Sequence, residues 1–189
     1  MFVHQGMSLQ KLDEQDLYLL TDLKQDSWLS THRVTIANDI DQNRWFSCMD
    51  RDIHCPKNLV LVAGSPRGAT DIPVGTTVGI FKILDIDYIN RTAEVGWDIF
   101  GDYRGKGLGK KLVNAGSAFC FDILALRRLN AEILANNTAS MKCAIHAGFV
   151  KEGCKREAVH RLGSYVDSVV YGSLASGRNL ALQPKINVV

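Results

Sequence analysis

A glycine-rich turn that follows a strand and opens a helix constrains this chain most. Residues 102–111 read Asp-Tyr-Arg-Gly-Lys-Gly-Leu-Gly-Lys-Lys. The first backbone N–H groups of a helix have no partner inside the helix, and they lie at the positive end of its dipole. Glycines at 105, 107 and 109 would let a ligand approach the backbone, and the lysines add positive charge. The pattern predicts a site for a pyrophosphate group.

Two other phosphate-binding loops do not fit this segment. The P-loop pattern fails because no Gly-Lys-Ser/Thr follows. The dinucleotide pattern GxGxxG fails on its spacing, and the segment comes too late in the chain to begin such a fold. A flexible basic turn without a ligand is the remaining alternative.

Hydrophobic periodicity predicts an α/β chain in the order β-α-α-β-β-β-α-β-α-β-β. We expect strands at residues 8–12, 59–63, 74–86, 93–100, 128–134, 149–157 and 165–174. Helices are expected from Asp13 through Leu23, and at residues 41–51, 102–126 and 138–147. Residues 1–175 would form one domain, followed by a tail at residues 176–189.

The bulk composition excludes several classes of protein. A net charge of +2 gives little attraction to nucleic acid, so we expect no nucleic-acid partner. Apolar stretches fall short of the roughly 20 residues that span a bilayer, and the first residues lack a signal-peptide pattern. The five cysteines form no CxxC pair, which favours free thiols over a metal site. We therefore expect a cytoplasmic protein without a metal or a membrane partner.

Three segments, in order, resemble the GNAT acyltransferases. Their cofactor motif, Gln/Arg-x-x-Gly-x-Gly/Ala, is matched by Arg-Gly-Lys-Gly-Leu-Gly at residues 104–109. Asn-Thr-Ala-Ser at residues 137–140, followed by Ala-Gly-Phe at residues 147–149, is similar to the family's Asn-x-x-Ser…Gly-Phe segment. Residues 156–171 resemble the branch that contains ribosomal-protein alanine acetyltransferases.

The resemblance implies a mixed central sheet of six to seven strands, with about four helices on both faces and a splay between the fourth and fifth strands. It also implies acetyl-CoA as co-substrate. The main-chain amides of residues 106–110 would bind the pyrophosphate, and the main chain at the end of the fourth strand would pair with the pantetheine arm. The cofactor residues would be Ile99, Phe100, Arg104, Gly105, Lys106, Gly107, Leu108, Gly109, Lys110, Asn137 and Ser140.

The activity implied is transfer of the acetyl group to a primary amine by direct attack. An alkylammonium with a pKa of about 10 must first lose a proton, which a carboxylate can accept. Glu94 is the first candidate base because it lies on the strand that enters the glycine turn. Period-two geometry puts Glu94, Gly96 and Asp98 on one face of that strand. Asp98, Glu157 and Asp167 are further candidates, and a surface carboxylate is the alternative for Glu94.

The residue that would protonate the leaving thiolate differs from the one usual in the family. Many members of the superfamily use a tyrosine where this chain has Ala144. The related branch suggests Ser140 as the donor instead, although Ser140 could equally serve only the start of a helix. A backbone N–H of Ile99 or Phe100 would polarise the carbonyl as an oxyanion hole does. Cys143 could form an acetyl-cysteine, but direct attack needs no such step.

The acceptor would be a protein N-terminal amine or a small-molecule amine such as an amino sugar. Residues 30–51 mix acidic and basic side chains, which does not favour a polycation. The substrate residues would be Trp45, Asp98, Tyr165 and Asp167. The alternative function is a non-catalytic module that binds acyl-CoA. We expect a monomer or a homodimer.

Overall fold

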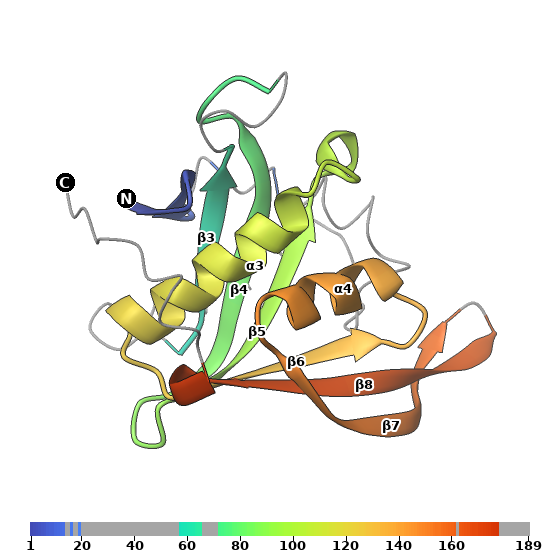
Figure 1. Ribbon diagram of the computed structural model, residues 1–189. Helices are drawn as coiled ribbons and strands as arrows, with labels where there is room; N and C mark the ends of the chain where they lie inside the picture. Colours follow the sequence, from blue (N-terminus) through green and yellow to red (C-terminus); the bar gives the residue numbers. More distant parts are fainter. Residues whose placement is uncertain (14–15, 17–18, 20–56, 66–71, 162, 178–189) are drawn as a thin grey trace.

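An eight-stranded sheet crosses the part of the chain that this computed structural model describes, namely residues 1–13, 16, 19, 57–65, 72–161 and 163–177. The strand order is β1-β2-β3-β4-β5-β6-β8-β7 (Figure 1). The strands are β1 Phe2–His4, β2 Met7–Lys11, β3 Leu59–Gly64, β4 Thr77–Asp87, β5 Thr92–Ile99, β6 Arg128–Leu134, β7 Val150–Arg161 and β8 Ser164–Leu174.

The mixed α/β fold is as predicted, but the sheet has one strand more than the six to seven expected. The added strand is β1, which pairs antiparallel with β2 and places Phe2 opposite Leu9. Gln5 and Gly6 form the connecting turn with φ of 49° and 82°, the positive values that tight hairpins require. Three residues are too few to show an alternating pattern, which is why periodicity missed β1.

The sheet opens between β5 and β6, which form the only parallel pair among the described strands. Their pairing covers three positions, from Thr92 opposite Arg128 to Glu94 opposite Asn130. Both strands continue beyond this point, β5 to Ile99 and β6 to Leu134. The two strands therefore diverge toward their C-terminal ends. This confirms the splay predicted between the strands expected at 93–100 and 128–134.

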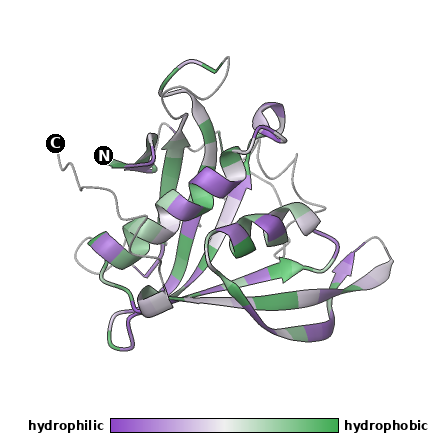
Figure 2. Cartoon of the chain, viewed as in Figure 1, coloured by the Kyte–Doolittle hydropathy of each residue, from purple (hydrophilic) through white to green (hydrophobic). Residues whose placement is uncertain are grey.

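Two α-helices, α3 Leu108–Ala118 and α4 Thr138–His146, lie on one face of the sheet (Figure 1). Apolar and polar residues alternate along α3 in Figure 2, and its buried side chains join the main core with Phe81 of β4. A Cβ added to Gly116 would meet the Phe81 ring at 2.4 Å. The absence of a side chain at Gly116 thus lets α3 pack closely on the sheet.

The helix expected over residues 102–126 is shorter at both ends. Residues Gly101–Tyr103 form a 3-10 turn, and α3 begins only at Leu108 because the positive φ of Gly105 and Gly107 cannot continue a right-handed helix. At the other end, Phe119–Ile123 forms a π-helical turn. Consequently the glycines precede the helix and form its N-terminal approach.

The opposite face of the sheet carries a smaller cluster of buried residues: Leu12, Leu19, Val60, Val62 and Ile80. The helices expected near Asp13 to Leu23 and at residues 41–51 lie largely or wholly outside the described residues, so the expectation of helices on both faces stays a prediction. The strand expected at 149–157 extends to Arg161 and pairs with β8 as a long hairpin. The strand expected at 74–86 spans Thr77–Asp87 instead.

Candidate functional site

The glycine turn before α3 is held in a conformation that only glycine adopts easily. Gly105 and Gly107 have φ of 76° and 75°, in the left-handed region. Gly107 is the N-cap of α3 and provides no capping side chain. A Cβ built on either glycine meets no heavy atom within 4 Å. The turn therefore presents bare backbone to an open space.

The backbone N–H groups of this turn have no acceptor among the described residues from Gly105 through Gly107. Tyr103 and Arg104, just before it, donate to the carbonyl oxygens of Phe100 and Gly101 at 2.9 and 3.2 Å. The first amides of α3 likewise lack partners within the helix, and the helix dipole adds positive potential there. Unpaired donors on bare backbone at a helix N-terminus suit an anion.

Gly109 has a different role from the other two glycines. A Cβ at this position would lie 3.0 Å from the Sγ atom of Cys143 on α4. The absence of a side chain at Gly109 therefore lets α3 and α4 approach each other. Helix packing, and not access for a ligand, explains this glycine. Burial raises the pKa of the Cys143 thiol, and the nearby charge of Lys110 opposes part of that shift. The thiol is thus mostly protonated near neutral pH, which disfavours an acetyl-cysteine.

Helix α4 begins with a side-chain cap at Asn137. The Oδ1 atom of Asn137 accepts a hydrogen bond from the Ser140 amide at 3.1 Å. Helices α3 and α4 follow the parallel strands β5 and β6, so both begin at the edge of the sheet where these strands diverge (Figure 1). The start of α4 therefore lies at the same edge as the glycine turn. Ala144, at the position of the family's tyrosine, is fully buried in the core.

The backbone of β5 corrects one expectation at this edge. The N–H of Phe100 donates to the Val78 oxygen at 3.0 Å, and its carbonyl accepts from Tyr103, so Phe100 has no N–H left to donate to a ligand. Antiparallel pairing alternates along a strand, so the N–H groups of Trp97 and Ile99 point away from β4 and toward the gap beside β6. The carbonyl of Ile99 accepts from Nε of Arg104 at 3.0 Å.

The candidate base Glu94 lies on the face of the sheet opposite α3 and α4. Val95 is buried in the main core under the helices, and side chains alternate, so Glu94, Gly96 and Asp98 point the other way. The Asp98 carboxylate pairs with Nζ of Lys82 on β4 at 2.6 Å. Lys82 is directly opposite Gly96 and reaches across it. The sequence did not indicate this ion pair, because it depends on the register of β4 against β5.

Of the remaining substrate candidates, Asp167 lies beside the C-terminal end of β6, where its carbonyl oxygen accepts from the Ala135 amide at 2.9 Å. Tyr165 is exposed in the hairpin of β7 and β8, where its ring meets that of His160 with centroids 5.1 Å apart. Asp167 bridges a β-bulge in the same hairpin: its Oδ1 atom accepts from the Glu157 amide at 2.8 Å. Glu157 has a φ of 48°, so the carboxylate of Asp167 stabilises an unusual backbone there. Trp45 lies outside the described residues.

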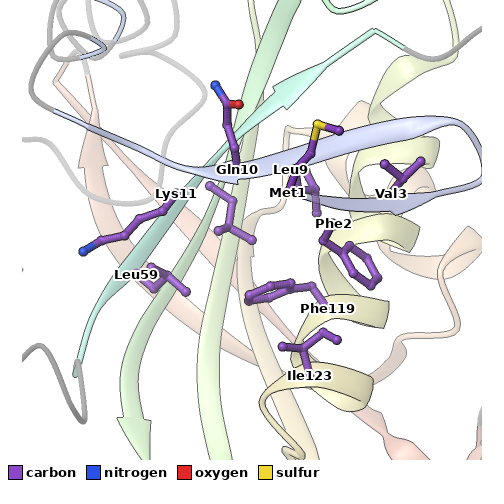
Figure 3. Close-up of a pocket in the computed structure, with 10 residues that line it drawn as sticks. Met1, Phe2, Val3, Leu9, Gln10, Lys11, Leu59, Phe119 and Ile123 are labelled. Atoms are coloured by element: carbon purple, nitrogen blue, oxygen red, sulfur yellow. The ribbon is translucent and has the colours of Figure 1, made fainter. Parts of the chain in front are cut away.

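A separate apolar cavity of about 400 Å³ lies beside the N-terminal hairpin. Figure 3 shows the side chains of Phe2 and Phe119 next to each other, while the polar ends of Gln10 and Lys11 point away. The two rings meet edge to face, with centroids 5.5 Å apart and planes at 76°. Phe119 follows the C-terminal end of α3, so the cavity is at the opposite end of that helix from Gly107. It therefore belongs to a different region from the glycine turn.

The described residues contain no group of three or more His, Cys, Asp or Glu side chains that could hold a metal ion. No helix in these same ranges is long and apolar enough to cross a membrane.

Comparison with known proteins gives relatives of one kind. A spermidine N(1)-acetyltransferase of Vibrio cholerae is 30% identical over 48% of this chain and 52% of its own length. A ribosomal-protein-serine acetyltransferase of Escherichia coli is 26% identical over 51% of this chain and 54% of its length. This chain therefore matches about half the length of each of these curated relatives.

Solved structures share the whole fold. A Vibrio cholerae spermidine N-acetyltransferase in complex with CoA and spermine superposes with a TM-score of 0.74, covering 91% of this chain and 97% of the other, at 21% identity. The family model described as an acetyltransferase (GNAT) domain matches residues 7–150, which is most of this chain. The resemblance seen in the sequence is confirmed: the chain belongs to the GNAT acetyltransferase family.

Proposed function

We propose that the protein transfers an acetyl group from acetyl-CoA to a primary amine by direct attack. The observation that carries this proposal is the bare turn at residues 105–107, whose N–H groups have no acceptor in the described chain and stand beside the gap between β5 and β6. With the pyrophosphate bound at the turn, the extended pantetheine arm of acetyl-CoA would lie in the gap. The family membership supports the same ligand.

The residues around the gap fit such a cofactor. Amides of residues 105–110 would bind the pyrophosphate, with Lys106 and Lys110 adding positive charge and Arg104 and Leu108 contributing main-chain atoms. The N–H of Ile99, which points toward the gap, would pair with the arm in place of Phe100. Asn137 and Ser140, at the start of α4, would line its inner end. Bound acetyl-CoA supplies an activated thioester carbonyl.

We assign the role of general base to Glu94. An amine that reaches the reacting carbonyl from the face opposite α3 would meet Glu94, either directly or through a water molecule. The carboxylate accepts the ammonium proton, and the neutral amine can then attack. Asp98 is a weaker candidate because its charge is already balanced by Lys82 at 2.6 Å.

Two other groups would act on the carbonyl and the sulfur. The atom of the arm that pairs with the Ile99 N–H would be the thioester carbonyl oxygen, so this one N–H would also stabilise the developing oxyanion. The Ser140 hydroxyl would donate to the leaving sulfur or relay a proton to it, while the Ser140 amide remains bound to Asn137. Ala144 is packed inside the core and offers no proton, so Ser140 takes the place of the tyrosine used elsewhere in the family.

The acceptor we propose carries a single primary amine, on a small molecule or at a protein N-terminus. Carboxylates on the face around Glu94 are paired with cations: Asp98 with Lys82, Glu152 with Arg128 and Glu132 with Lys155. The described face thus has little uncompensated negative charge for a polyamine. The named activities of the two curated relatives, on spermidine and on a ribosomal protein, define the panel to test.

The test is thiol release from acetyl-CoA with spermidine, amino sugars and peptides with free N-termini. Turnover with at least one amine supports the enzyme, and a preference for the single amines supports the proposed acceptor. Binding of acetyl-CoA without turnover on any amine would instead favour the non-catalytic module. A cytoplasmic location and a monomeric or homodimeric state stay predictions.

A further inference from the structure

The indole N–H of Trp97 is a buried donor without a partner. Its Nε1 atom has less than 1 Å² of accessible surface and makes no hydrogen bond within the described structure. The ring packs against Phe149, with centroids 6.1 Å apart and planes at 55°. Buried indole N–H groups ordinarily find an acceptor, and an unpaired one destabilises the fold. A buried N–H that is unpaired in the protein alone points to an acceptor supplied by a bound ligand.

The location of Trp97 connects this donor to the gap between the diverging strands. Trp97 lies three residues beyond Glu94, the last position at which β5 pairs with β6. Its side chain is on the same side of the sheet as α3 and α4, where it packs against the main core. Phe149, its ring partner, directly follows the turn after α4. The indole therefore stands at the wall of the gap that the proposed function assigns to the pantetheine arm.

We propose that the Trp97 indole N–H donates a hydrogen bond to a carbonyl oxygen of the acyl-pantetheine arm, which makes Trp97 a cofactor-binding residue. The inference rests on the proposed function. The arm offers carbonyl acceptors at its amides and at the thioester. A ligand carbonyl there would satisfy the orphan donor, so the chain is less stable without the ligand than a fully paired core would be.

The test replaces Trp97 with phenylalanine, which keeps an aromatic ring against Phe149 and removes the N–H. Calorimetry would compare acetyl-CoA, CoA and adenosine 3′-phosphate 5′-diphosphate, which has the pyrophosphate but no arm. We expect Trp97→Phe to bind acetyl-CoA about tenfold more weakly and the arm-less nucleotide as the wild type does. Weaker binding of both acetyl-CoA and CoA would place the acceptor at an arm amide, and an effect on acetyl-CoA alone would place it at the thioester.

The arm-less nucleotide separates this role from a structural one. Trp97→Phe removes an unpaired donor but also leaves a space in the packing beside Phe149, so its melting temperature shows only that the variant is folded. A purely structural tryptophan would weaken the binding of all three ligands equally. Unchanged affinity for acetyl-CoA in the variant would overturn the inference and leave the proposed function standing. Failure of the wild type to bind acetyl-CoA would reject both.

A second measurement needs no comparison of affinities. The chain has three tryptophans, so its indole N–H groups give three resolvable NMR signals, and the one missing in Trp97→Phe identifies Trp97. That signal should shift when acetyl-CoA is added and stay in place with the arm-less nucleotide. A Trp97 signal that does not shift when acetyl-CoA is added would also overturn the inference.

Discussion

Replacing Gly107 with valine would place a side chain on the N-cap of α3 without a clash inside the protein. Nothing lies within 4 Å of the new Cβ, so the effect on folding comes from the backbone alone. Gly107 has a φ of 75°, where a residue with a side chain costs roughly 1–2 kcal/mol and a branched one is less tolerated still. We expect about 2 kcal/mol, which lowers the melting temperature of a domain of this size by about 4–8 °C.

The effect on the ligand should be larger than the effect on folding. The valine side chain would occupy the open space in which the turn presents its amides. Loss of two charge-assisted hydrogen bonds, at roughly 1.5 kcal/mol or more each, amounts to about 3 kcal/mol. Affinity for acetyl-CoA should therefore fall more than about 100-fold.

Gly75 provides the matched control. It has a φ of 84° and also has no heavy atom within 4 Å of a built Cβ, but it lies in the turn before β4. Gly75→Val should lose similar stability and keep wild-type affinity in calorimetry. Wild-type affinity in Gly107→Val, with melting temperatures lowered alike in both variants, would refute the assignment of the turn to the pyrophosphate.

Three further predictions concern the chemistry. Glu94→Gln should lower turnover about 100-fold at neutral pH, and the loss should shrink as the pH nears the amine pKa of about 10. The affinity for acetyl-CoA should stay unchanged, and a wild-type pH–rate profile in the variant would exclude Glu94 as the base. Ser140→Ala should slow single turnover by about tenfold or less without lowering the melting temperature, because Asn137 caps α4 through the main chain of Ser140; unchanged single-turnover rates would return Ser140 to a purely structural role. Burial raises the pKa of Cys143, so iodoacetamide at pH 8 should alkylate its thiol more slowly than that of the exposed Cys154. Peptide mapping would measure both rates, and equal rates would contradict the conclusion that the Cys143 thiol is mostly protonated.

The sequence predicts the fold well wherever a local pattern has few alternatives. Gly105 and Gly107 are such a case: alternate glycines between a strand and an apolar helical stripe indicate a turn, and the structure has a turn there with positive φ at both residues. The splay between β5 and β6 came from the family resemblance, since no local pattern marks where two strands stop pairing. The three-residue β1 shows no period at all and was missed.

The parts of the site that the sequence could not predict depend on strand register. Alternation alone separates Glu94 from Val95, but it does not say which atoms of the neighbouring strand lie opposite. Register brings Lys82 beside Asp98, and it also fixes that the Phe100 amide binds Val78. Both facts change the proposed site: Asp98 becomes the weaker candidate for the base, and the Ile99 N–H replaces that of Phe100 as the proposed donor to the cofactor.

The parallel pair β5–β6 explains why the binding groups gather at one edge. Each strand of a parallel pair ends on the same side, and each is followed here by a helix that begins there. Two helix N-termini, with their positive dipole ends, therefore point toward one gap. An antiparallel β6 would have sent α4 to the far edge and left the glycine turn alone. Glu94 lies on the opposite face. In the proposed mechanism the open gap would therefore also be the passage through which a base on one face acts on a thioester held from the other.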